Sequence, residues 1–215
     1  TPALITAKVT DPDGVAFVQL QYQIVLPGQY IPARLPVPYG ELVSGLSSEP
    51  TPNPAYFDSA NWSTFTMFDN GLGGDAVAGD SVYTATLPPQ AHRTLVRYRV
   101  LAGDALGATV VAPYDDDASL NFAYFVYDGV PEYRNNANQV VADSAAIDSL
   151  PVYHLLTRAA DLEDANAYDA ADEIPQGLEA RFVYNWSGTM VYNGKVYDNI
   201  TNRLRGANGR YLTDG

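Results

Sequence analysis

The chain has 215 residues, of which 47% are hydrophobic, and its formal charge at pH 7 is −13. The apolar content excludes a chain that is disordered throughout. The negative charge argues against nucleic acids and anionic membrane surfaces as partners, because both are negatively charged themselves. The chain has no cysteine, so it has no disulfide and no thiolate metal site. No apolar run approaches the ~18 residues that a membrane-spanning helix needs.

The first part of the chain has the sequence pattern of a β protein. Runs that alternate apolar and polar residues, or that are rich in β-branched and aromatic residues, predict strands. These runs are residues 4–10, 15–25, 62–68, 81–87, 93–102, 108–112 and 122–127. The Asp-Pro-Asp-Gly sequence at 11–14 predicts a turn that joins the first two runs in a hairpin, with Asp11 and Asp13 as turn formers. Strands at this spacing favour an immunoglobulin-like or fibronectin-like β-sandwich over residues 1–130.

Residues 27–54 interrupt this pattern. They contain seven prolines and three glycines, which break both helices and strands. We therefore expect a long, partly extended excursion over the protein surface.

An acidic, glycine-rich loop at residues 68–83 is the most informative feature of the chain. Its oxygen-bearing candidates for a metal site are Asp69, Asn70, Asp75 and Asp80. Oxygen ligands suit a hard cation such as calcium, and the four glycines between them can adopt the positive φ angles that turn the oxygens inward. The spacing is not that of an EF-hand, and the alternative is a Gly/Asp turn that binds no ion. A weaker cation candidate, with a solvated acidic turn as its alternative, is Asp115, Asp116 and Asp117.

The second part of the chain has a different sequence pattern, which mixes predicted helix and strands. Residues 131–149 are a predicted linker, and residues 150–215 are a predicted small, incomplete α+β domain. Its expected elements are a strand at 150–156, a helix from Arg158 to about Ala171 with Thr157 as N-cap, and strands at 178–184, 189–192, 195–197 and 200–205. The dipeptide Asn193-Gly194 favours a tight hairpin between two of these strands.

Several segments resemble known sequences. Residues 150–155 (Leu-Pro-Val-Tyr-His-Leu) and 196–210, which contain the Arg-Leu-Arg-Gly sequence at 203–206, resemble the opening of the CotH kinase-like family of atypical, secreted or spore-coat protein kinases. The acidic loop, residues 92–99 and residues 121–127 are similar to the immunoglobulin-like module that often precedes CotH domains in bacterial surface proteins. This family commonly has a serine where the chain has Gly209. The resemblance implies a bacterial protein that is secreted or displayed on the cell surface.

The resemblance also implies where a kinase activity would reside. Phosphoryl transfer needs a cation over the phosphates and acidic metal ligands, which in the family follow the Arg-x-Arg-Gly strand and would lie beyond Gly215. ATP and Mg²⁺ would be cofactors of such a longer parent. Arg203 and Arg205 are candidate phosphate contacts, with exposed strand arginines as the alternative. The segment itself is expected to be catalytically inert, and a larger kinase parent is the alternative function.

The leading expectation is therefore a non-catalytic extracellular segment for spacing, adhesion or self-association. The open sheet edges of an incomplete α+β unit invite strand addition from a neighbouring protein, which would build an oligomer or filament. Carbohydrate binding is a further alternative, because Trp186 and the 16 tyrosines could stack on sugars; cross-strand aromatic pairs explain the tyrosines equally well. His92 and His154 are expected to be packed or surface residues.

Overall fold

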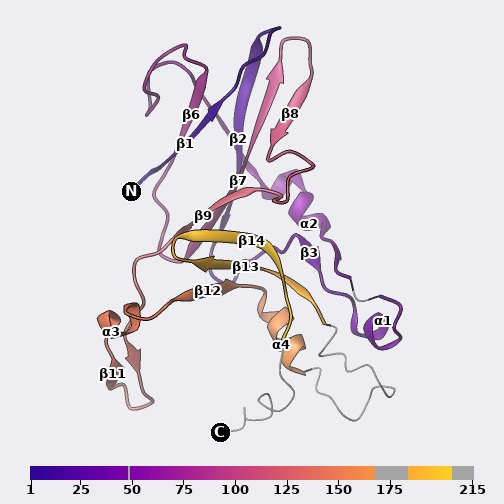
Figure 1. Ribbon diagram of the computed structural model, residues 1–215, viewed down its shortest axis with the longest axis vertical. Helices are drawn as coiled ribbons and strands as arrows, with labels where there is room; N and C mark the ends of the chain where they lie inside the picture. Colours follow the sequence, from indigo (N-terminus) through magenta and orange to yellow (C-terminus); the bar gives the residue numbers. More distant parts are fainter. Residues whose placement is uncertain (48, 168–183, 205–215) are drawn as a thin grey trace. The chain divides into compact units, whose positions relative to one another are not determined.

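The computed structural model describes residues 1–47, 49–167 and 184–204, and within them the chain is mainly β, with several antiparallel sheets (Figure 1). This confirms the predicted fold class; the immunoglobulin-like or fibronectin-like detail stays a prediction. No helix in these ranges is both long enough and apolar enough to span a bilayer.

The strands expected in the first part of the chain are present at nearly the expected positions. They are β1 (Ala3–Lys8), β2 (Val15–Val25), β5 (Ser63–Thr66), β6 (Val82–Leu87), β7 (Thr94–Asp104), β8 (Thr109–Ala112) and β9 (Phe122–Val126). The central sheet has the order β5-β2-β7-β8, and β9 pairs with the first half of β7 on the same edge that β8 occupies further along. Figure 1 shows β2 and β7 as long neighbouring strands, with β8 folding back beside β7.

The predicted hairpin between the first two strands is wrong. β1 pairs with β6 in a separate two-stranded sheet, from Ala3 opposite Leu87 to Lys8 opposite Val82, whereas β2 pairs with β5 and β7. The turn at 11–14 therefore leads from one sheet to the other. Alternation shows which side chains of a strand are buried, but it does not show which strand lies beside it.

One apolar core joins these two sheets. It is formed by Ile5, Val18, Leu20, Met67, Ala85, Leu87, Val96, Val100 and Ala102. Alternate residues of β1 face this core, and so do alternate residues of β2 and β7, as the period of two in a strand requires. The two sheets thus bury their apolar faces against each other.

The excursion at residues 27–54 is more structured than predicted. It contains β3 (Arg34–Leu35), α1 (Tyr39–Val43), β4 (Thr51–Pro52) and the start of α2 (Pro54–Phe57), which the 3₁₀ turn Ser59–Asn61 follows. Val37 and Leu42 are buried in a second core with Ala165, Tyr184 and Trp186. The prolines therefore do not keep this segment on the surface, because its apolar residues have a core of their own to fill.

The later elements are mostly short. They are β10 (Tyr133–Arg134), β11 (Val140–Ala142), α3 (Ser144–Asp148), β12 (Tyr153–Leu156), α4 (Ala159–Ala167), β13 (Trp186–Tyr192) and β14 (Lys195–Asn202). The predicted hairpin at Asn193-Gly194 is confirmed: it joins β13 to β14, and both residues have positive φ, at 49° and 73°. Residues 131–149, predicted as a linker, contain the β10–β11 pair and α3. The predicted strand at 178–184 and the last turn of the predicted helix at 158–171 fall almost wholly outside the described residues.

The contacts between residues divide the chain into two units. One unit contains residues 1–27, 58–154 and 191–198, and the other contains residues 28–57, 155–190 and 199–215. The expected boundaries at 130 and 150 do not coincide with this division. The second unit takes its core from segments that are far apart in the sequence, because Val37 and Leu42 pack with Tyr184 and Trp186.

Candidate functional site

The acidic loop brings three of its four predicted ligands together. One carboxylate oxygen each from Asp69, Asp75 and Asp80 lies within 4.8 Å of the others. Asp75 is buried, with 8% of its surface exposed. Asn70 has a local role, since its Oδ1 accepts a hydrogen bond from the Leu72 N–H at 3.0 Å. The three carboxylates are the part of the loop that could bind a cation.

Backbone N–H groups of the loop fix these carboxylates. Asp69 accepts hydrogen bonds from the N–H groups of Gly79, Asp80 and Ser81, and Asp75 accepts one from Gly71 at 2.5 Å. No described Lys, Arg or His forms an ion pair with any of the three carboxylates. Three negative charges this close repel one another, and the repulsion is stronger where water is excluded, as it is at Asp75. A bound cation would relieve it.

Glycine is required at one point of this loop for two separate reasons. Gly71, Gly73, Gly74 and Gly79 all have positive φ, as expected from the sequence. At Gly74, with φ of +104°, a Cβ atom would also lie only 2.5 Å from Leu4 Cδ1 and 3.1 Å from Thr86 Oγ1. A side chain at position 74 would therefore have to displace Leu4 or Thr86 of the β1–β6 pair, and the half-exposed Leu4 can move.

We expect Gly74→Ala to lower the free energy of unfolding by about 1–3 kcal/mol, because it adds both backbone strain and a steric overlap. Gly79→Ala is the matched control, since its φ is +76° but nothing lies within 4 Å of a Cβ there. Urea unfolding of both variants measures the difference. An equal loss of stability in the two variants would show that the overlap with Leu4 and Thr86 costs nothing and leave backbone strain as the sole cause.

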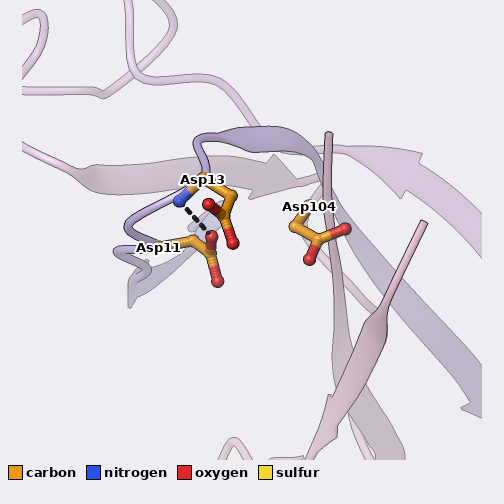
Figure 2. Close-up of side chains that lie close together, drawn as sticks. All are labelled: Asp11, Asp13 and Asp104. Carbon is orange, nitrogen blue, oxygen red and sulfur yellow. Dashed lines mark hydrogen bonds between the residues drawn. The ribbon is translucent and has the colours of Figure 1, made fainter. Parts of the chain in front are cut away.

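A second acidic cluster was not predicted. Asp11, Asp13 and Asp104 also place one oxygen each within 4.8 Å of one another. Figure 2 shows Asp11 and Asp13 on the turn after β1, with the Asp13 N–H donating to Asp11 Oδ1 at 2.8 Å, and Asp104 opposite them at the end of β7. Asp104 Oδ1 also accepts hydrogen bonds from the N–H groups of Leu106 and Ala108, so this carboxylate shapes its own turn.

Asp11 and Asp13 were identified in the sequence as turn formers, and the hydrogen bond between them fits that role. The sequence gives no signal for the third member. Asp104 is 91 positions after Asp13, and only the approach of the 11–14 turn to the end of β7, where the Ala105 N–H donates to the Gly14 oxygen at 3.1 Å, brings it near.

The remaining candidate site residues form no comparable group among the described residues. Asp117 Oδ2 accepts a hydrogen bond from the Tyr114 N–H at 2.8 Å, and Asp115, Asp116 and Asp117 are exposed and do not form a three-carboxylate group of the kind described above. Arg203 is exposed just after β14. Arg205 lies outside the described residues. Phosphate contact by either arginine stays a prediction.

Aromatic residues line a hollow of about 400 Å³ in the first unit. His154 lies 4.6 Å from Tyr127 and 5.1 Å from Phe125, measured between ring centres, and Tyr192 and Asp148 are also in the lining. Burial, together with the positive charge of Arg93, lowers the pKa of His154. The alternative of a sugar-stacking surface does not extend to Trp186, because this residue is 1% exposed within the second core and cannot present a ring face to a ligand.

Comparisons with protein-family models, curated proteins and solved structures find no match to this chain. The resemblance to the CotH kinase-like family is therefore not supported by them and stays an expectation from the residues quoted above. A function is therefore inferred from the arrangement of the side chains in the structure.

Proposed function

We propose that this chain is a non-catalytic structural segment of an extracellular bacterial protein, in which calcium stabilises the 68–83 loop. The observation on which the proposal depends is the group of Asp69, Asp75 and Asp80, with Asp75 buried and no cationic side chain paired to the three among the described residues. Extracellular modules commonly bind calcium at 10⁻⁴–10⁻³ M, a range that partly exposed sites with few carboxylates can reach.

The mechanical role of such an ion follows from the connections of the loop. The loop joins the neighbourhood of β5 to β6, and its position against Leu4 connects it to β1. A cation bound by three carboxylates would lower their mutual repulsion in the folded state only, because the unfolded chain does not bring them together. The function would then be to space or connect neighbouring modules, with association through open strand edges.

The test is calcium-dependent stability. Calcium at a hundred times its Kd should add about 2.7 kcal/mol to the free energy of unfolding, which for a chain of this size raises Tm by roughly 5–10 °C over the value in chelator. Asp75→Asn and Asp80→Asn should remove most of this difference. Thermal unfolding followed by circular dichroism, in calcium and in chelator, measures it.

Two matched variants distinguish the loop from the other acidic groups. Asp11→Asn tests the second cluster, and Asp115→Asn tests the exposed aspartate run. Both should retain the full calcium effect. A calcium effect that survives Asp75→Asn and Asp80→Asn but disappears in Asp11→Asn would move the site to the second cluster, and no calcium effect in the unmutated protein would end the proposal.

The kinase alternative depends on residues after Gly215 and on the resemblance alone. ATP-dependent phosphorylation by a longer protein containing this segment would be the observation that revives it.

A further inference from the structure

The core between the two sheets is incomplete on one side. Val100 and Ala102 of β7 are buried in it, and on β8 the residues directly opposite them are Ala112 and Val110. Residues directly opposite in an antiparallel pair point to the same face of the sheet. Val110 therefore faces the core layer, yet it is 48% exposed.

The same is true where β9 pairs with β7. Tyr98 packs against the core, and Phe122, which lies opposite Tyr98, is 42% exposed. The covering sheet has only two strands, β1 and β6, and the buried core that it shares contains residues of β2 and β7 but none of β8. Val110 and Phe122 are left largely exposed on this apolar face. A third strand beside β1 is what would cover it.

The free side of β1 borders a groove that fits such a strand. Two adjoining hollows of about 490 and 140 Å³ share Val9, Thr10, Ala102 and Val110, and together they follow the chain from Thr6, in the second half of β1, to Asp11, past its end. We name this feature the β1–β8 groove. β1 pairs with β6 only, among the described strands, so its other edge has backbone N–H and C=O groups that can pair with an added strand.

The acidic residues at one end of the groove favour an added strand that carries a basic residue. Asp11 and Asp104 line one end of the β1–β8 groove, and Asp13 lies with them in the cluster of Figure 2. An arginine or lysine at the end of an added strand would meet these three carboxylates. A second copy of this chain is less suited, because each copy has a net charge of −13.

We propose that the β1–β8 groove binds an extended strand of a partner protein, with apolar side chains at alternate positions and a basic residue at the end that reaches Asp11, Asp13 and Asp104. The added strand pairs with the free edge of β1, and its apolar side chains cover Val110 and Phe122. About six residues match the groove, which borders the chain from Thr6 to Asp11. This proposal rests on strand addition as part of the proposed function, but it does not depend on calcium in the 68–83 loop.

The test uses synthetic peptides with blocked ends. The probe alternates threonine and valine over six residues and has an arginine at one end; it is made in both chain directions, because the added strand could run either way. One control peptide has glutamate in place of arginine, and another has a proline at its centre, which removes a backbone donor. Binding is followed by the amide NMR signals of Thr6–Val9 and by calorimetry.

Two variants of β8 localise the binding. Val110→Lys places a charge in the groove and should weaken binding of the arginine peptide at least roughly tenfold, while the exposure of Val110 lets the protein fold. Val111→Lys is the matched control, since neighbouring residues of a strand point to opposite faces, and it should leave binding unchanged. Asp11→Asn should weaken binding of the arginine peptide but not of a peptide with an uncharged end.

Each other outcome overturns the proposal. No binding by either peptide direction, equal binding of the proline peptide, or equal loss in Val110→Lys and Val111→Lys would exclude strand addition at this groove. A concentration-dependent dimer that Val110→Lys dissociates would make a second copy the occupant instead. The titrations are made in chelator and in calcium: binding in chelator with no calcium effect on Tm would overturn calcium stabilisation alone.

Discussion

Asp198→Asn is expected to lower the free energy of unfolding by about 3–5 kcal/mol, because it leaves a buried guanidinium without its carboxylate. Arg97 is 0% exposed in the first half of β7, and its Nε and Nη2 donate to the two oxygens of Asp198 at 2.7 and 3.0 Å. Its Nη1 donates to Gln23 Oε1 at 3.0 Å, and Asn121 Nδ2 donates to Asp198 at 2.9 Å. These bonds connect β2, β7 and β14 within the first unit.

The measurement is urea unfolding, with the change in midpoint and slope reported separately. The matched control is Arg134→Met, which removes the exposed ion pair of Arg134 with Glu132 and should cost no more than about 1 kcal/mol. In the double variant Arg97→Met with Asp198→Leu, both charges are gone, and much of the lost stability should return. A double variant as unstable as Asp198→Asn would mean that the hydrogen bonds of the pair, rather than its unbalanced charge, determine the loss.

Alternation was the strongest predictor of structure in this sequence. The expected strand at 15–25 has the bounds of β2, and Asn193-Gly194 indicated the β13–β14 hairpin. In both cases the deciding interactions are local: side chains two apart share a face, and a tight turn needs two positive φ angles. Local patterns are also why three of the four predicted oxygen ligands, within one short loop, lie close together.

The parts that were missed depend on residues far apart in the chain. The partner of β1, the contact of Asp104 with the turn at 11–14, and the Arg97–Asp198 pair each join segments separated by roughly 80–100 positions. A pattern within a single segment has no information about which distant segment it will meet. The strand at 93–102 was recognised, but nothing in its alternating arginines indicated that Arg97 would be buried.

Trp186 was considered for a sugar-stacking surface only as an alternative to packing among aromatic residues, and the structure places it in the core of the second unit. It packs there with Tyr184, Val37 and Leu42, its ring centre 5.8 Å from that of Tyr184. Aromatic residues at the surface and in the core look the same in a sequence. Only the folded structure shows whether the Trp186 ring is exposed. The unexpected structure of residues 28–57 explains the difference, because these residues cover the indole.

Trp186→Ala should therefore destabilise the second unit by about 3–5 kcal/mol, through lost burial and the cavity that remains. Trp186→Phe is the matched control and should cost less than about 1.5 kcal/mol, since it retains most of the ring volume and the indole N–H has no hydrogen-bond partner among the described residues. Amide hydrogen exchange at Tyr30 and Thr189, whose side chains are hydrogen-bonded at 3.0 Å, follows the second unit directly.

Fluorescence of Trp62 shows whether a variant of Trp186 destabilises the second unit alone or both units together. Trp62 belongs to the first unit, where the Arg99 guanidinium lies 3.9 Å from its ring centre, and it is the sole tryptophan left in both variants. If the units unfold independently, Trp186→Ala accelerates exchange at Tyr30 and Thr189 while the urea midpoint of Trp62 fluorescence stays unchanged. If they unfold together, that midpoint falls by the full amount. Unchanged stability, with loss of binding to a glycan, would contradict the buried position of Trp186 and restore the alternative of a sugar-stacking surface.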